Sequence, residues 1–166
     1  MKTKVFFLAS LLSLFISCKP STDDAVNYND KIVNEQILVA STIDSLNVLI
    51  SNKDTTHIKN YYKELLHTIK TSSNKIDSIK DFDNQPDYNN NIKKLFKVYQ
   101  DVIDNEYKNL INVCYLSDSS ITKDTFNYFN FTLNQITEKI SKQMKEFNTF
   151  QENFAKKYNF SLVEKK

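Results

Sequence analysis

Few residues of this chain could take part in metal chemistry. Glu64 and His67 have the Glu-x-x-His spacing by which di-iron carboxylate bundles hold metal. Such a site needs a second Glu-x-x-His, and Glu138 is followed by Ser141 in the histidine position. At about 100° per residue, His67 also points about 160° away from Leu65 on a helix. We therefore expect a solvated helix face here, with no metal and no other cofactor.

Nucleophilic chemistry would depend on Cys114. A nucleophilic cysteine needs a base that a third group orients. Both histidines, His57 and His67, fall on one predicted helix, and no pattern places either beside Cys114. The chain also has no glycine, which the nucleophile elbow of serine hydrolases usually requires. The sequence therefore predicts a small buried core residue at Cys114 and no catalytic residues.

The other cysteine, Cys18, ends a segment with the layout of a secretory signal. Lys2 and Lys4 give it a positive start, and Val5–Ile16 is an apolar run of twelve residues. As a helix this run is about 18 Å long, too short for a hydrocarbon core of about 30 Å. We expect residues 1–17 to be a cleaved signal peptide rather than a membrane-spanning helix.

The end of this segment, Phe15-Ile16-Ser17-Cys18, resembles the lipobox of bacterial lipoproteins. The resemblance implies that Cys18 becomes the mature N-terminus and is lipidated with acyl chains such as palmitate. Each buried methylene group contributes about 0.8 kcal/mol, and stable anchoring needs more than one chain. The polar residues 18–27 are then expected to form a flexible tether.

Composition excludes several classes of function. All 22 basic residues are lysine, so the chain lacks the planar arginine fork that binds phosphate, carboxylate or guanine at two points. Without glycine it cannot form the loops whose backbone approaches a nucleotide phosphate. The formal charge of +2 falls to zero when Lys2 and Lys4 leave with the signal peptide. We expect no nucleic-acid partner, because no basic excess attracts one.

Apolar residues recur at steps of three and four along the rest of the chain, the pattern of amphipathic helices. No segment alternates with period two for long enough to predict a strand. The predicted helices cover residues 25–51, 55–82, 86–115 and 123–157, with Asp54, Pro86 and Thr122 at helix starts. Because short links favour antiparallel neighbours, the sequence predicts an all-α fold, an antiparallel up-down-up-down four-helix bundle over residues 28–166.

The last predicted helix has the strongest apolar stripe, from Phe126 to Tyr158. Its phenylalanines carry large apolar areas, so we expect the stripe to supply much of the core. The residues predicted to be mostly buried are Phe129, Ile136, Ile140 and Phe147.

Two aromatic residues of this helix, Tyr128 and Phe131, are not explained by the stripe. Phe131 is two residues from both Phe129 and Leu133, so it points about 160° away from each. Tyr128, three residues before Phe131, shares that outer face. An aromatic pair on a face turned to water predicts a possible interaction patch. The alternative is an incidental pair, or one that is covered by the chain after Tyr158.

Both ends of the helical region carry a further resemblance. Phe154–Leu162 (FAKKYNFSL) follows the last helix, and Tyr28–Val33 (YNDKIV) opens the first. These stretches resemble small helical lipoproteins of Bacteroidetes and are similar to a Leptospira-type surface-protein family. The resemblance implies a helical fold and an envelope location, without catalytic residues. Asp54-Thr55-Thr56 also resembles the O-glycosylation acceptor of Bacteroidetes.

These observations lead to one hypothesis of function. We expect a lipid-anchored protein of the bacterial cell envelope, in the outer membrane, that acts as a non-enzymatic binding or structural module. Its partners would be the membrane, through the anchor, and an envelope protein or glycan, with periplasmic and surface orientations both open. Two alternatives remain: a small-ligand carrier with an aromatic-lined cavity between helices, and an envelope enzyme whose site no motif reveals.

Overall fold

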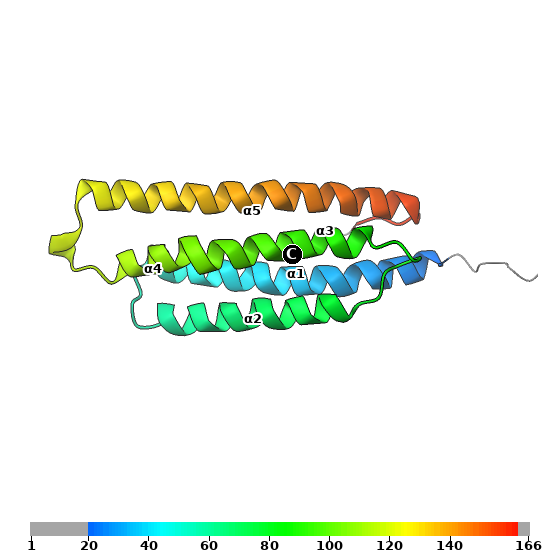
Figure 1. Cartoon of the computed structure of the whole chain (residues 1–166), viewed down its shortest axis with the longest axis horizontal. Coiled ribbons are helices and arrows are strands. Elements are labelled where there is room, and N and C mark those ends of the chain that lie inside the picture. The colour runs from blue at the N-terminus through cyan, green and yellow to red at the C-terminus, as the bar shows by residue number, and fades with distance from the viewer. Residues whose placement is uncertain (1–19, 163–166) are drawn as a thin grey trace, which may run out of the picture.

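The computed structural model describes residues 20–162, and every regular element in this range is helical (Figure 1). The elements are α1 (Thr22–Ser51), α2 (Ile58–Ser78), α3 (Asp87–Val102), the π-helix η1 (Ile103–Tyr107), α4 (Lys108–Cys114), the 3-10 turn η2 (Asp118–Ser120) and α5 (Lys123–Lys157). The predicted all-helical fold is confirmed. The predicted signal peptide and Cys18 lie outside the described residues. Between residues 20 and 162, no helix is both long enough and apolar enough to cross a membrane.

The helices pack lengthwise into a bundle (Figure 1). α1 packs against α2, and α3 packs against both α2 and α5. At one end, the Thr22 hydroxyl donates a hydrogen bond of 3.0 Å to the Tyr158 carbonyl. At the other end, the Tyr115 hydroxyl donates to the Thr55 carbonyl at 2.6 Å. The start of α1 therefore lies beside the end of α5, and the segment after α4 lies beside the α1–α2 link.

Of the two predicted polar caps, Thr122 caps α5, whereas Asp54 lies in the turn before α2, whose N-cap position is taken by His57 without a side-chain cap hydrogen bond. The Thr122 hydroxyl accepts the backbone N–H of Thr125 at 3.2 Å, and α5 has the predicted bounds. The Asp54 carboxylate accepts the backbone N–H of His57 at 3.3 Å in the turn that leads into α2. The helix itself begins at Ile58, three residues later than predicted, because the intervening residues form turns.

The first helix begins earlier than predicted, at Thr22. The Ser21 hydroxyl accepts the backbone N–H of Asp24, and the Asp24 carboxylate accepts the backbone N–H of Ser21. This reciprocal capping box satisfies two backbone groups that would otherwise lack partners, and so it fixes the helix start. The prediction of a flexible tether over 18–27 is therefore wrong for residues 22–27, which belong to α1.

The second helix ends earlier than predicted, at Ser78 rather than at residue 82. Ile79 already has extended backbone angles, and the link then contains two successive residues with positive φ, Asp83 (54°) and Asn84 (56°). Short polar side chains tolerate this left-handed conformation better than others, and this chain has no glycine to use instead. Phe82, the last residue of the predicted range, lies in this link and packs against the core.

The predicted core is largely confirmed. In α1 the apolar residues that recur at helical spacing are all buried, namely Tyr28, Ile32, Val39, Ile43, Leu46 and Ile50. In α5, Ile136 and Phe147 are buried, whereas Phe129 and Ile140 are half-buried against the core. Phe126, predicted as part of the stripe, is 60% exposed. The first turn of α5 projects past the end of α4 (Figure 1).

Candidate functional site

The sequence predicts one continuous helix over residues 86–115, but the structure has a π-helical turn inside it, η1. A wide turn of this kind inserts an extra residue into the helical register. As a result, Val102 and Ile103 are both fully buried, although they are adjacent in the sequence and a spacing of three and four residues admits either one as the core position. Because such turns are frequent at functional sites, η1 is the first candidate site.

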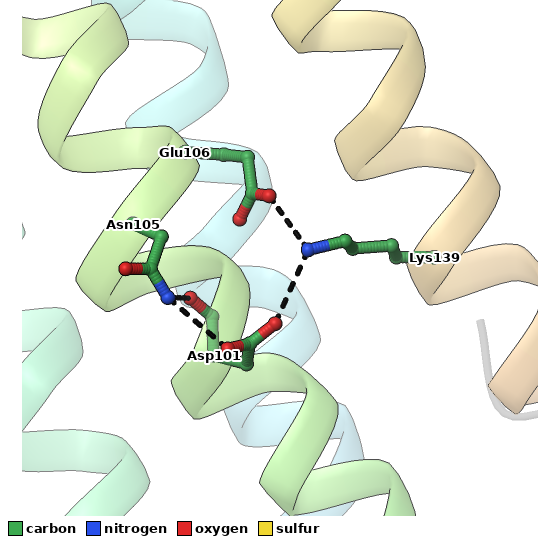
Figure 2. A network of polar contacts seen from close by, with 4 residues as sticks. All are labelled: Asp101, Asn105, Glu106 and Lys139. Carbon is green, nitrogen blue, oxygen red and sulfur yellow. Dashed lines mark hydrogen bonds and ion pairs between the residues drawn. The ribbon is translucent and has the colours of Figure 1, made fainter.

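The inserted residue also shifts the register, and so changes which of the following side chains faces the core. Tyr107 is buried, and its hydroxyl donates a hydrogen bond of 2.7 Å to Asn47 Oδ1 on α1. Glu106, one residue earlier, is displaced to the side of the helix that faces α5 (Figure 2). The wide turn thus places a tyrosine in the core and a carboxylate at the interface between two helices.

On this side of the helix, two carboxylates meet one ammonium group (Figure 2). Lys139 Nζ on α5 lies 2.6 Å from Glu106 Oε1 and 3.2 Å from Asp101 Oδ2. Residues five apart point about 140° apart on an α-helix, but a π-helix closes its hydrogen bonds five residues along and brings them to one side. Asn105 donates to Asp101 Oδ1 at 3.1 Å and holds that carboxylate in place. The π-turn therefore allows one lysine to bridge two acids.

This cluster is suited to holding helices together rather than to acid–base chemistry. Lys139 donates hydrogen bonds to Glu106 and to Asp101, and both raise the pKa of its ammonium group, the bond to Glu106 more than the bond to Asp101. A lysine that keeps its proton cannot act as a nucleophile or general base near neutral pH. The second oxygen of Glu106 is buried and has no hydrogen-bond partner among residues 20–162. The described residues also contain no group of three or more metal-ligating side chains.

The residues that the sequence singled out for metal chemistry lie on the surface of the bundle. Glu64 and His67 are both exposed on α2, as the helical spacing predicted. His57 is exposed at the start of α2, where its Nδ1 lies 2.8 Å from Asp54 Oδ2. This hydrogen bond lowers the pKa of the Asp54 carboxyl. Within the described part of the chain, no hydrogen bond joins either histidine to Cys114.

Cys114 itself is buried at the end of α4, as predicted. Its Sγ lies 3.9 Å from the Ile50 carbonyl oxygen on α1. Burial raises the pKa of the Cys114 thiol, and the nearby Lys53 ammonium offsets part of that rise. A thiol that resists ionisation in an apolar site is chemically inert, because the thiolate is the reactive form.

We expect Cys114 to react slowly with a thiol reagent such as Ellman's reagent in the folded protein and rapidly after unfolding in guanidinium chloride. The reason is its burial together with the raised thiol pKa. A Cys18→Ala variant leaves Cys114 as the sole cysteine, so the absorbance change reports on one thiol. Equally fast labelling in the two states would contradict this prediction and would indicate a reactive site.

Exposed aromatic side chains gather at the end of the bundle where α5 begins. Tyr128 and Phe131, the predicted patch, are 45% and 59% exposed. Phe126, 60% exposed, lies on the same helix but points about 160° away from Tyr128. The segment between α4 and α5 adds further exposed apolar side chains at this end. We call this set the aromatic tip; its members are Tyr115, Leu116, Ile121, Phe126, Tyr128 and Phe131.

The chain after α5 does not cover the aromatic tip. The Tyr158 carbonyl is bonded to Thr22, at the opposite end of the bundle. Phe160 packs edge-to-face against Phe154, with ring centroids 6.0 Å apart. The alternative that the chain folds back over Tyr128 and Phe131 is therefore wrong as far as residue 162, the last that the structure describes.

Comparisons with protein-family models, with curated proteins and with solved structures find no match to this chain. The resemblance to helical lipoproteins of Bacteroidetes and to a Leptospira-type family therefore stays a prediction. So does glycosylation of Asp54-Thr55-Thr56, although both threonines are exposed in the α1–α2 link.

Proposed function

We propose that this protein is a lipid-anchored helical bundle of the bacterial outer membrane that binds another envelope component through its aromatic tip. The bundle has four helical segments: α1, α2, the continuous run from α3 through η1 to α4, and α5. We further propose that these segments follow one another up-down-up-down, as an antiparallel four-helix bundle. The short links between the segments support this arrangement, because they leave no room for a long crossover. Under this proposal the protein is a binding module and carries out no chemistry of its own.

The position of the aromatic tip relative to the predicted anchor carries the proposal. Ser21, which caps α1, follows Cys18 by three residues. From there α1 runs for 30 residues, about 45 Å, toward the end of the bundle that carries the tip. A molecule held at Cys18 could therefore present its exposed aromatic side chains about 45 Å from the anchored end. A partner in the envelope would meet the tip before the rest of the bundle.

The composition of the tip favours a partner recognised by packing rather than by charge. Tyrosine and phenylalanine supply large contact areas at small cost in side-chain entropy, and they are enriched in interface centres. The mature chain has no net charge to steer association. We infer a protein partner with a complementary apolar surface, and a glycan partner would be the alternative outcome of the same experiment.

The test is a pull-down from detergent-solubilised envelope with the lipidated protein as bait. Changing both Tyr128 and Phe131 to serine should abolish capture of the specific partner, while circular dichroism and the melting temperature stay close to those of the wild type. Substitutions at exposed positions usually change stability by no more than about 0.5 kcal/mol, so the fold should persist.

A matched control changes two exposed apolar residues elsewhere. Leu38 and Val48 on α1 are 46% and 58% exposed and lie outside the tip. The Leu38→Ser, Val48→Ser variant should capture the partner as the wild type does. If the tip variant and this control recover the same proteins in the same amounts, the tip is not the binding surface.

A further inference from the structure

A cavity of about 160 Å³ lies at the end of the bundle opposite the aromatic tip. Its walls come from the α2–α3 link, the start of α3 and the last turns of α5. Five of the lining residues are aromatic, Tyr88 and Phe154 among them, and two are charged, Asp87 and Lys157. None of these residues belongs to the tip, so the inference below does not rest on the proposed tip function.

The aromatic walls of the cavity are held in fixed positions. Tyr88 is almost fully buried, and its hydroxyl donates a short hydrogen bond of 2.6 Å to Asn29 Oδ1. Its ring meets that of Phe154 edge-to-face, with centroids 4.7 Å apart. Gln151 donates to the same Asn29 oxygen at 2.9 Å, so α1, α3 and α5 are joined behind the wall. A wall fixed in this way loses little entropy when a ligand binds.

The α2–α3 link completes the cavity at some cost in backbone strain. Asp83 and Asn84 both have positive φ, and non-glycine residues keep this conformation only where their surroundings hold it. Here the Tyr158 hydroxyl donates to Asp83 Oδ2 at 3.0 Å, and the Tyr158 ring packs edge-to-face against Phe82 at 5.0 Å. The strained turn thus delivers Phe82 and Gln85 to the cavity.

Two residues of opposite charge, Asp87 and Lys157, line the cavity. Lys157 Nζ lies 2.6 Å from Gln85 Oε1 and 5.0 Å from the centroid of the Tyr158 ring. Across residues 20–162, neither Lys157 nor Asp87 forms an ion pair with a protein group. The positive charge comes from the end of α5 and the negative charge from the start of α3. A ligand with both charges would satisfy both groups.

We propose that this cavity binds a free aromatic amino acid with a single six-membered ring, such as phenylalanine or tyrosine. The ring would lie among the aromatic walls, the carboxylate at Lys157 and the ammonium group at Asp87. An apolar cavity of about 150 Å³ is known to accept benzene, so the volume suits one ring. A cationic ligand without a carboxylate is disfavoured, because the Lys157 ammonium already lies over the Tyr158 ring.

The test is isothermal titration calorimetry on the whole protein with four probes: phenylalanine, phenylacetate, phenethylamine and alanine. Phenylalanine should bind with a Kd below about 1 mM, which a ligand of this size can reach. Phenylacetate and phenethylamine, which each lack one charge, should bind at least about tenfold more weakly, and alanine should give no detectable binding. The proposal would be overturned if phenylacetate or phenethylamine bound as tightly as phenylalanine, or if phenylalanine did not bind at all.

Charge variants assign each contact. Lys157→Gln should remove the preference for phenylalanine over phenethylamine, and Asp87→Asn should remove the preference over phenylacetate. Lys156→Gln, at an exposed neighbour that does not line the cavity, should bind like the wild type. Loss of the preference in Lys156→Gln as well would contradict the assignment to Lys157. The serine variant of Tyr128 and Phe131 should also bind phenylalanine normally, so this proposal and the tip proposal can fail separately.

Discussion

Replacing Phe147 by alanine is expected to lower the free energy of unfolding by about 3–5 kcal/mol. The Phe147 side chain is fully buried and packs edge-to-face against Tyr88, with ring centroids 5.9 Å apart. Truncation removes this apolar burial and leaves a void between α3 and α5, and packed helices close such voids only in part. Domains of this size have a total stability of about 5–15 kcal/mol, so the loss is a large share of it.

Urea denaturation followed by circular dichroism measures this loss as a shift of the midpoint at unchanged slope. Phe126→Ala is the matched control, because it makes the same change in the same helix at a side chain that is 60% exposed. We expect the control to change stability by no more than about 0.5 kcal/mol. Similar losses in the two variants would contradict the difference in burial and support the uninterrupted stripe that the sequence suggested.

Local signals made most of the helical fold predictable. The α1 stripe could be identified because each core position follows the last by three, four or seven residues, and α5 could be bounded because Thr122 is a strong cap. The start of α1 was missed although its signal was present. Ser21 and Asp24 have the spacing of a capping box, but with aspartate where glutamate or glutamine is usual.

The π-turn could not be predicted from local periodicity, because its stabilising partners lie far away in the chain. Lys139 on α5 bridges Glu106 and Asp101, and Asn47 on α1 accepts the hydrogen bond from Tyr107. The single hint in the sequence was that two adjacent residues, Val102 and Ile103, fitted the same core position of the predicted helix equally well. An ambiguity of that kind is what an inserted residue produces.

The cavity near the end of α5 could not be predicted from sequence patterns either. Its aromatic residues follow the spacing of a packed core, so the sequence treats them as core. The residues that make it a candidate site, Asp87 and Lys157, are 70 positions apart. Both line the cavity because the start of α3 packs beside the end of α5, and residue spacing along the chain does not encode that long-range contact.

Replacing Cys18 by alanine is expected to release the protein from the membrane fraction or to leave it with an uncleaved signal peptide. Under the proposed function the Cys18 sulfur carries part of the lipid anchor, and alanine has no group that can accept it. A single acyl chain gives only reversible membrane binding, of the order of 10⁴ M⁻¹, so an anchor without this site should hold almost none of the protein.

Fractionation of bacteria that express the full chain, together with labelled palmitate, tests this expectation. Cys114→Ala is the matched control, because it removes the other cysteine, which is buried in the bundle. The control should remain in membranes and incorporate palmitate. A Cys18→Ala protein that stays in membranes at the processed size would contradict lipid anchoring, and with it the proposed distance of about 45 Å between the anchored end and the aromatic tip. Exposure of Tyr128 and Phe131 does not depend on the anchor, so their role in binding would still be decided by the pull-down alone.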